Sequence, residues 1–279
     1  MTDKLVIIAG KGAYPRILAE SARAGGIGHI FVLAFKGETN RSIVPLADKV
    51  RWVPVGRLLE FLEVLRDFGA DQAVMAGQIT PTALFRLRPD KAMFKLLSKL
   101  EKRNAETIFG AVGEEMRKIG VELKPASLFM QNAMPSAGPL TARTPDDRER
   151  IDIALGLDVA KTTSSLDIGQ TVVIKEGTIL AVEAFEGTDR TILRAGKLGG
   201  TGGVVVKVAK RGHDMRFDIP VIGLKSLKIF KKAGISALAI EAGRTILLER
   251  KKIVSVADTM NLAILAVNLP GSDDYKNEF

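Results

Sequence analysis

The chain has 279 residues, of which 46% are hydrophobic, and a formal net charge of +9 at pH 7. This length fits two domains of moderate size, and the apolar content excludes a disordered chain. The sequence has no cysteine and only two histidines, His29 and His213, which excludes disulfides, thiolate chemistry and a multi-histidine zinc site.

The first half of the chain alternates short apolar runs with amphipathic stretches. The predicted strands are 4–10, 29–35, 50–55 and 71–77, and the predicted helices are 14–26, 56–70, 82–100 and 105–119. Strands and helices in alternation indicate a parallel sheet with helices on its faces. The sequence therefore predicts a Rossmann-like N-terminal domain over residues 1–134.

The second half has a different character. Residues 135–146 are rich in Pro, Gly and Ser without apolar periodicity and are predicted to be a linker. The domain that follows, 147–279, is expected to begin with a helix capped by Thr144. The elements expected after this helix are a hairpin at 170–187, a short helix at 187–198, strands at 202–210 and 211–223, a basic helix at 224–234, and further strands and helices to residue 267. The fold class is thus α/β in two domains, the C-terminal one with mixed strands.

The sequence also indicates where the protein works. The apolar stretch within the first residues is too short for a signal peptide. No segment approaches the ~18 to 20 uninterrupted apolar residues of a membrane-spanning helix. We therefore expect a soluble, cytoplasmic protein. The positive charge favours an anionic partner, which would be a nucleic acid, a phosphorylated metabolite or an acidic membrane surface. Aromatic residues are only 5%, which argues against a nucleic-acid binder.

Two turns in the first half are candidate contacts for a nucleotide. Gly10 and Gly12 follow the first strand, where glycines let the backbone approach an anion at a helix N-terminus. Proline at position 15 replaces the last glycine of a dinucleotide fingerprint. Gln78 and Thr80 follow a later strand and could contact a sugar or base. An ordinary tight turn, and capping of the next helix, are the alternatives.

Acidic residues gather on a strand-to-helix turn in the second half. Glu183, Glu186 and Asp189 surround Thr188, where the free N–H groups of a helix start would suit a phosphate. The carboxylates would suit hydrated Mg²⁺. Simple capping of the helix by Thr188 or Asp189 is the alternative.

The stretch 211–223 alternates charged and apolar residues. Its charged residues are Asp214, Arg216 and Asp218, which would share one face of a strand. This face would be either a solvated edge or the wall of a site. Lys207 and Lys210 come just before it, and phosphoryl transfer needs cations beside a carboxylate. Arg244, on a later glycine turn, is a further phosphate candidate, and the basic helix 224–234 would be solvated or would meet an anionic membrane.

Five stretches, spread over both halves, carry a resemblance to a known family. They are IAGKGAYP at 8–15, MAGQITP at 75–81, the segments 167–189 and 234–258, and KVAKRGHDMRFDIPVIG at 207–223. Together they resemble the LpxI-type UDP-2,3-diacylglucosamine pyrophosphatases over roughly residues 4–267.

This resemblance implies a Mg²⁺-dependent hydrolase of lipid A biosynthesis. It would split UDP-2,3-diacylglucosamine into UMP and 2,3-diacylglucosamine 1-phosphate (lipid X), with the substrate held between the two domains. The family's key aspartate lies in an R-x-D-x-P-x-x-G pattern, which here is Asp218. The family further implies a homodimer and transient contact with the cytoplasmic face of the inner membrane.

The expected roles combine this resemblance with residue chemistry. The expected catalytic residues are Asp218 and Asp214, and the expected Mg²⁺ ligands are Asp218, Glu186 and Asp189. The expected substrate-binding residues are Gly10, Gly12, Gln78, Gln170, Thr188, Lys207, Lys210, Arg216 and Arg244. The alternatives are another nucleotide-sugar diphosphatase, a dinucleotide-binding oxidoreductase, which the incomplete glycine fingerprint disfavours, and a non-catalytic nucleotide-sugar binding protein.

Overall fold

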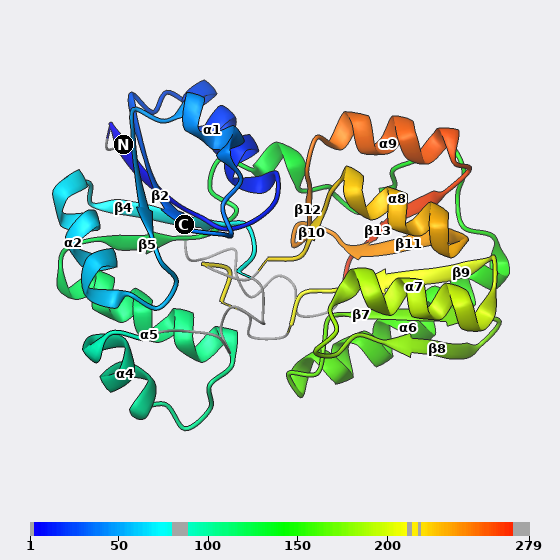
Figure 1. The fold of residues 1–279 in the computed structure, drawn as a ribbon. Helices are drawn as coiled ribbons and strands as arrows, with labels where there is room; N and C mark the ends of the chain where they lie inside the picture. Colours follow the sequence, from blue (N-terminus) through cyan, green and yellow to red (C-terminus); the bar gives the residue numbers. More distant parts are fainter. Residues whose placement is uncertain (1–2, 80–88, 211–213, 217–218, 270–279) are drawn as a thin grey trace. The chain divides into compact units, whose positions relative to one another are not determined.

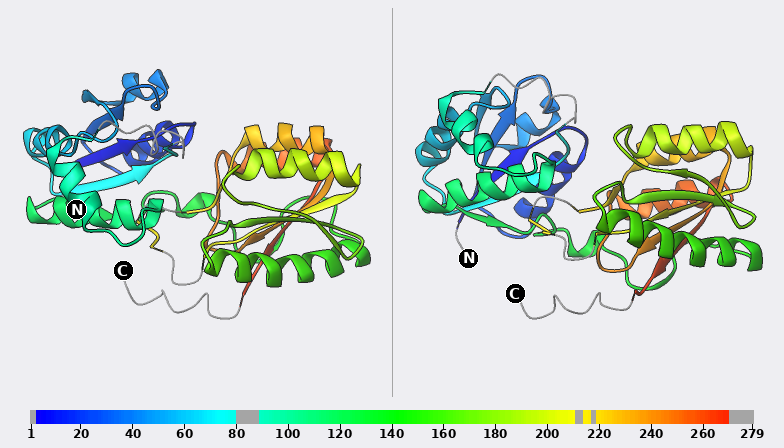
Figure 2. Two further views of the ribbon diagram at one scale, coloured as in Figure 1. Left: turned by 60° about the horizontal axis from the view of Figure 1, so that its bottom comes forward. Right: turned by 90° about the horizontal axis from the view of Figure 1, so that it is seen from below.

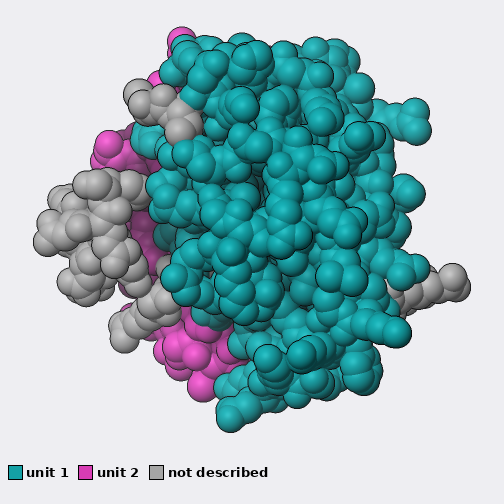
Figure 3. Space-filling view, turned by 90° about the vertical axis from the view of Figure 1, so that its left-hand side faces the viewer, with its two compact units in different colours: residues 1–131, 214–218 teal, residues 132–213, 219–279 magenta. Residues whose placement is uncertain are grey.

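The fold consists of two α/β units, each with its own sheet and core (Figure 1). The computed structural model describes residues 3–79, 89–210, 214–216 and 219–269. Unit 1 comprises Met1–Gln131 and Asp214–Asp218, and unit 2 comprises Asn132–His213 and Ile219–Phe279 (Figure 3). The predicted α/β class, with a parallel sheet followed by a mixed one, is confirmed. Within the described ranges no helix combines the length and hydropathy needed to cross a bilayer.

Unit 1 is built on a parallel sheet of the order β3-β2-β1-β4-β5. The strands are β1 (Lys4–Ala9), β2 (His29–Phe35), β3 (Lys49–Val53), β4 (Gln72–Ala76) and β5 (Glu122–Lys124). The α-helices are α1 (Tyr14–Ala24), α2 (Leu58–Phe68), α4 (Lys91–Ser98) and α5 (Ala105–Lys118). Because β2 and β4 lie on opposite sides of β1, the strand order reverses between β1 and β4, and open α/β sheets bind ligands at such a point.

The four predicted strands and the predicted helices of the first half are found, with one limit, and the edge strand β5 was not predicted. The predicted helix 82–100 is described only from residue 89 onward, where α4 begins after Asp90. The Asp90 carboxylate accepts the N–H of Met93 at 2.8 Å and so caps the helix. Thr80 and the start of the predicted helix lie outside the described residues.

Unit 2 has a six-stranded mixed sheet of the order β6-β13-β11-β9-β7-β8. The strands are β6 (Gly138–Pro139), β7 (Thr171–Lys175), β8 (Thr178–Val182), β9 (Gly203–Lys207), β11 (Ile235–Glu241) and β13 (Ala263–Val267). Parallel β9, β11 and β13 form its centre, and β7 is antiparallel to both β9 and β8. Short strands β10 (Val221–Ile222) and β12 (Ile246–Leu247) pair separately.

Helices cover both faces of this sheet (Figure 2). Alternate strand residues such as Val205 and Leu238 pack with α7 (Thr188–Gly199), α8 (Leu224–Ala233) and α9 (Arg250–Thr259). The intervening residues, such as Val206, pack with α6 (Asp147–Ser165) on the opposite face. The sheet is therefore buried on both sides, as the Val- and Ile-rich strands predict.

The segment predicted to be a linker, 135–146, supplies a strand. Its β6 pairs antiparallel with β13, and the N–H of Leu140 donates to the carbonyl of Ile264 at 2.8 Å. The predicted helix cap is wrong by two residues. Asp146, and not Thr144, caps α6, because its carboxylate accepts the N–H of Glu149 while the Glu149 carboxylate accepts the N–H of Asp146.

The strand predicted over 211–223 is also wrong. Met215 and Arg216 lie in a turn, and within this stretch only Val221 and Ile222, among the residues described, form a strand. The Asp214 carboxylate accepts the N–H of Arg216 at 3.0 Å. This local side-chain bond competes with a strand ladder and favours a turn.

Helices α7 and α8 pack closely because Gly196 has no side chain. A Cβ atom there would lie 2.5 Å from the carbonyl oxygen of Ala233, which belongs to the backbone and cannot move at low cost.

Gly196→Ala is therefore expected to lower the free energy of unfolding by about 1–3 kcal/mol, measured by urea denaturation. Gly113→Ala in α5 is the matched control, since its Cβ would meet only the Leu123 side chain at 3.6 Å. It should gain up to about 1 kcal/mol from helix propensity. Equal stability of the two variants would contradict close packing at Gly196.

Candidate active site

Charged side chains of unit 2 lie at the carboxyl edge of its central strands. Lys207 ends β9 and pairs with Ile240 of β11, whose last residue is Glu241. Thr171 begins the antiparallel strand β7 and pairs with Lys207 from the other side. The two strand-end charges are therefore neighbours at the sheet edge where α/β folds bind ligands.

The first group at this edge, which we call the Lys207 cluster, consists of Lys207, Thr171, Thr188 and Glu183. Lys207 is 8% exposed, and its Nζ donates to Thr171 Oγ1 at 3.1 Å and to Thr188 Oγ1 at 3.0 Å. Thr188 donates to Glu183 Oε1 at 2.7 Å, while Glu183 Oε2 lies 3.9 Å from Lys207 Nζ. That oxygen is buried and accepts no hydrogen bond from the described residues. The cluster thus holds a cation and an incompletely satisfied carboxylate away from water.

The start of α7 adds backbone donors next to this cluster. Gly187 is the N-cap residue with a φ of 81°, a conformation that glycine adopts without strain. Thr188 and Asp189 do not cap α7, which was the alternative interpretation of this turn. Gly187 is the N-cap residue of α7 and no side-chain cap is found among the described residues, and the Thr188 hydroxyl donates to Glu183 instead. In the part of the chain that the structure describes, no side chain caps the first N–H groups of α7, and a helix N-terminus favours negative charge.

A second group, the Glu241 cluster, was missed by the sequence analysis. Glu241 is fully buried, and its Oε2 accepts from Lys161 Nζ at 2.8 Å and from the N–H of Ala209 at 2.9 Å. Arg244, 7% exposed, lies 3.5 Å from Glu241 Oε1 and donates to the carbonyl of Lys210 at 3.5 Å. Lys161 also donates to the Ala209 carbonyl at 2.7 Å. These bonds fix the backbone directly after Lys207. Arg244 is therefore a buried residue that holds the backbone of the site in place.

The acidic residues predicted to gather around a metal have separate cationic partners. Glu186 accepts from Arg194 at 2.6 Å, and Asp189 accepts from Lys225 at 2.6 Å. Among the residues described, no three carboxylate or imidazole groups lie together as a metal site requires. The described donor set therefore does not fit Mg²⁺ by itself, and Asp218 lies outside the described residues.

Arg194 changes the acidity of Glu186. Its hydrogen bond holds the pKa of the Glu186 carboxyl below the ordinary value of 4.5. The charged form is thus stabilised by folding, and this contribution is present above pH 4.5 and is lost as the pH falls below it. Arg194→Ala is expected to raise the pKa of Glu186 towards 4.5 in a carbon-13 NMR titration. Arg190→Ala on the same helix should leave it unchanged, and an unchanged pKa in both variants would contradict the pairing.

Unit 1 brings together the residues predicted for the nucleotide. The loops after β1 and β4 form an antiparallel bridge in which the N–H of Lys11 donates to the Gln78 carbonyl at 2.7 Å. A Cβ on Gly10 would lie 2.8 Å from that carbonyl oxygen, so the bridge requires glycine there. Gly12 has a φ of 98°. Gly10, Gly12 and Gln78 thus meet at the reversal of strand order between β1 and β4.

The Asp214–Arg216 turn is anchored beside these loops. The N–H of Ala126 donates to the Met215 carbonyl at 2.7 Å, and the buried Tyr14 hydroxyl, at the start of α1, donates to the Ala126 carbonyl. The Asp214 carboxylate binds the Arg216 guanidinium at 2.6–3.0 Å, which raises the pKa of Arg216. This ion pair is half-buried, so it presents a fixed guanidinium in unit 1.

The candidate residues are therefore divided between the two units. Those in unit 1 are Gly10, Gly12, Gln78, Asp214 and Arg216, and those in unit 2 are Gln170, Glu186, Thr188, Asp189, Lys207, Lys210 and Arg244. Gln170 contributes its carbonyl, which accepts the N–H of Val208 at 3.1 Å and so ties β7 to the end of β9.

Two of the solved structures that this chain resembles are remote likenesses. Phosphoribosylglycinamide synthetase from Anaerococcus prevotii is 14% identical, with a TM-score of 0.26, over 63% of this chain and 37% of its own. The biotin carboxylase domain of Hydrogenobacter thermophilus 2-oxoglutarate carboxylase is 12% identical, with a TM-score of 0.27, over 71% and 41%.

Comparison with protein sequences is specific. The LpxI N-terminal domain family matches residues 4–133, and the LpxI C-terminal domain family matches residues 136–265. A relative from Caulobacter vibrioides, UDP-2,3-diacylglucosamine pyrophosphatase LpxI, is 31% identical over 95% of this chain and 98% of its own length. Because the similarity runs through both units, the protein belongs to the LpxI family.

Proposed function

We propose that the protein hydrolyses the diphosphate of UDP-2,3-diacylglucosamine in lipid A biosynthesis. The products would be UMP and 2,3-diacylglucosamine 1-phosphate. The observation that carries the proposal is full-length similarity to a pyrophosphatase named for this substrate. The site supports it independently, because Lys207 supplies a buried cation and the start of α7 supplies backbone N–H groups, both of which suit phosphoryl groups.

Each unit would have a separate part in this reaction. The glycine loops of unit 1, with Gln78, would hold the nucleotide, since the backbone at Gly10 and Gly12 can approach an anion closely. Lys207, Lys210 and the first turn of α7 would neutralise the diphosphate. Gln170 and Arg244 would support these residues, because both bind the backbone that follows Lys207.

The proposed catalytic carboxylate is Asp218, with Asp214 beside it in sequence. Asp218 would accept a proton from the attacking water or hold a metal. Asp214 already binds Arg216, so its proposed part is to orient that guanidinium towards a phosphoryl oxygen. A bidentate carboxylate pair fixes the guanidinium plane, and such preorganised cations stabilise charge in the transition state.

We also propose that the reaction depends on Mg²⁺. In phosphoryl-transfer sites this ion is usually held by one or two carboxylates together with substrate phosphates. Glu186 or Asp189 would then exchange a present partner, Arg194 or Lys225, for the ion. When bound, Mg²⁺ would neutralise charge on the diphosphate.

The remaining proposals concern the state of the protein in the cell. We propose a homodimer, as the resemblance to the LpxI family implies. We further propose that it lies in the cytoplasm, peripheral to the inner membrane, because the substrate is a lipid and the chain is basic. Sedimentation equilibrium tests the dimer, and a mass equal to the 30.1 kDa chain would contradict it.

The reaction is tested by phosphorus NMR of the protein with UDP-2,3-diacylglucosamine in ¹⁸O-labelled water, with Mg²⁺ or with chelator. UMP and lipid X should form only with Mg²⁺, and the label should reside in lipid X if water attacks the glucosamine-side phosphorus. Turnover in chelator would remove the metal proposal alone. No turnover with substrate bound would leave a non-catalytic nucleotide-sugar binding protein, and turnover of other UDP-sugars in preference would indicate a different diphosphatase.

A further inference from the structure

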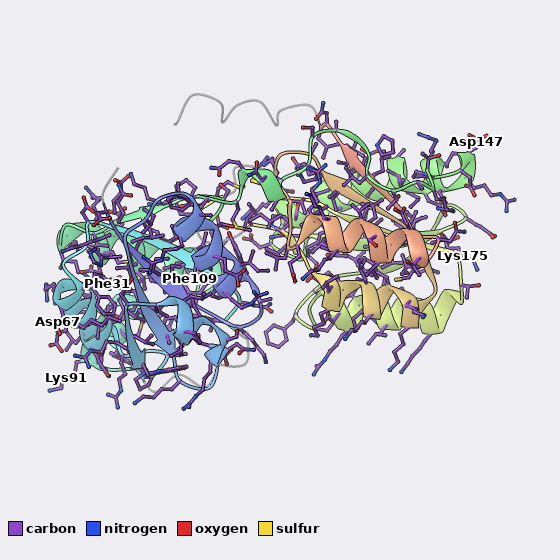
Figure 4. The ribbon with its side chains drawn as sticks, turned by 90° about the horizontal axis from the view of Figure 1, so that it is seen from above. Phe31, Asp67, Lys91, Phe109, Asp147 and Lys175 are labelled. Carbon is purple, nitrogen blue, oxygen red and sulfur yellow. The ribbon has the colours of Figure 1, made fainter. Side chains whose placement is uncertain are left out.

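The two helical layers of unit 2 carry very different charge. Helices α7, α8 and α9 hold ten lysines and arginines against two acidic residues, a net charge of +8. Helix α6, on the opposite face, has three basic and four acidic residues, a net charge of −1. The whole chain has a net charge of +9. Within unit 2 the positive charge is thus concentrated in one helical layer, where α8 and α9 lie away from Asp147 of α6 (Figure 4).

The basic residues of this face form stripes on neighbouring helices. On α7 the stripe consists of exposed Arg190, Arg194 and Lys197, and on α8 of exposed Lys225, Lys228, Lys231 and Lys232. Residues three or four apart lie on one side of a helix, so each stripe faces solvent while Ile192 and Phe230 face the core.

The fold packs the two helices that carry these stripes against each other. Gly196 allows α7 to approach the backbone of Ala233 at the end of α8, so the two basic stripes lie on closely packed helices. Ion pairs join Arg194 to Glu186 and Lys225 to Asp189. Lys228, Lys231 and Lys232 have no ion-pair partner among the described residues. Since closely spaced like charges destabilise a folded protein, this arrangement indicates an external anionic partner.

The uncharged residues of the face favour a lipid surface over a nucleic acid. Leu198, directly after Lys197 on α7, is 67% exposed, and Val256 on α9 is 40% exposed. Apolar side chains among cations suit the headgroup region of a bilayer. The one aromatic residue of the three helices, Phe230, is fully buried, so the face offers no ring for base stacking.

We propose that the exposed face of α7, α8 and α9, the basic face, docks the protein on an anionic lipid bilayer. The inference rests on the proposed function in one respect, which is that a diacylated substrate resides in a membrane. The face adjoins the Lys207 cluster, because Thr188, the first residue of α7, belongs to that cluster. Docking would therefore bring the carboxyl edge of the unit 2 sheet to the bilayer surface.

Co-sedimentation with vesicles tests this proposal without any need for turnover. The intact protein should bind vesicles containing about one third phosphatidylglycerol, and should not bind pure phosphatidylcholine. Binding should weaken as salt rises above about 0.1 M, where the screening length is about 10 Å. Equal binding to both vesicles would overturn the proposal.

Matched charge reversals locate the surface. Lys228→Glu with Lys232→Glu on α8 should weaken binding at least about 30-fold, since each cation near an anionic bilayer contributes about fivefold. Arg148→Glu with Arg150→Glu on exposed positions of α6 changes the charge equally and should have far less effect. Leu198→Ser should weaken binding a few-fold through its lost apolar burial.

Other results would contradict the docking surface. Equal losses in the α6 and α8 variants would show attraction by net charge alone. Duplex DNA bound more tightly than vesicles, and weakened by the α8 changes, would identify a nucleic-acid surface instead. If the phosphorus NMR assay shows no turnover while vesicle binding follows the expected pattern, the proposed function fails and the docking surface stands.

Discussion

Replacing Glu241 by alanine is expected to lower the free energy of unfolding by about 3–5 kcal/mol. The carboxylate is fully buried and accepts from Lys161 and from the N–H of Ala209, with Arg244 at 3.5 Å. Without it, two cations, themselves largely buried, would lose the carboxylate that they share. Removing one partner of a buried ion pair costs far more than the pair itself contributes.

Urea denaturation of matched variants measures this effect. Glu176→Ala removes a carboxylate whose pairing with Arg148, at 3.9 Å, is exposed on both sides, and it should change stability by less than about 1 kcal/mol. The double variant Glu241→Ala with Lys161→Met should be more stable than Glu241→Ala alone, because one uncompensated charge is gone. Similar losses for Glu176→Ala and Glu241→Ala would contradict a buried ionic cluster.

Replacing Lys207 by methionine is expected to lower kcat/KM for the proposed diphosphate hydrolysis by about 10²–10³-fold. The ammonium is 8% exposed and held by Thr171 and Thr188, so it is preorganised towards charge on a phosphoryl group. Methionine keeps the length of the side chain and removes only the charge and its donors. Lys91→Met, exposed at the start of α4 (Figure 4), is the control and should keep full activity. Normal kcat/KM in folded Lys207→Met would remove the cluster from the reaction.

Asp218→Ala separates binding from chemistry in the same assay. If Asp218 acts on water or metal, the variant should bind UDP-2,3-diacylglucosamine, by calorimetry, with turnover abolished. Lys207→Met, by contrast, should weaken both steps, since charge neutralisation acts on bound substrate and on the transition state. Turnover near normal in Asp218→Ala would assign the catalytic role elsewhere.

The elements that could be predicted from the sequence are those that local patterns determine. The hairpin around Glu176 and Gly177 is an example, because its turn needs a φ of 74° at the second position, which glycine adopts without strain. For the stretch 211–223 the local pattern gave a wrong prediction, a strand. Its alternation of charged and apolar residues has the period of a strand, but the Asp214 side chain binds the backbone of Arg216 and turns the chain.

In the candidate site, too, local patterns predicted some residues, whereas contacts between distant parts of the chain could not be predicted. Lys207 and Thr188 were predicted from local motifs and do meet, 3.0 Å apart. The Glu241 cluster joins residues 80 positions apart, so no local pattern could reveal it. A single signal was available, the lone carboxylate of Glu241 at the end of the apolar run 235–240, because a charge in such a run needs a buried partner.

The excursion of residues 214–218 into unit 1 determines how the protein can be divided. The family boundary near residue 134 separates the sequence into halves, but the chain crosses between the units three times. A fragment ending there would lack the Met215 carbonyl that accepts the N–H of Ala126, and with it the Asp214–Arg216 ion pair. An exchange of whole domains between relatives, or a split reporter built from this protein, would therefore have to carry this short insert along with the N-terminal half.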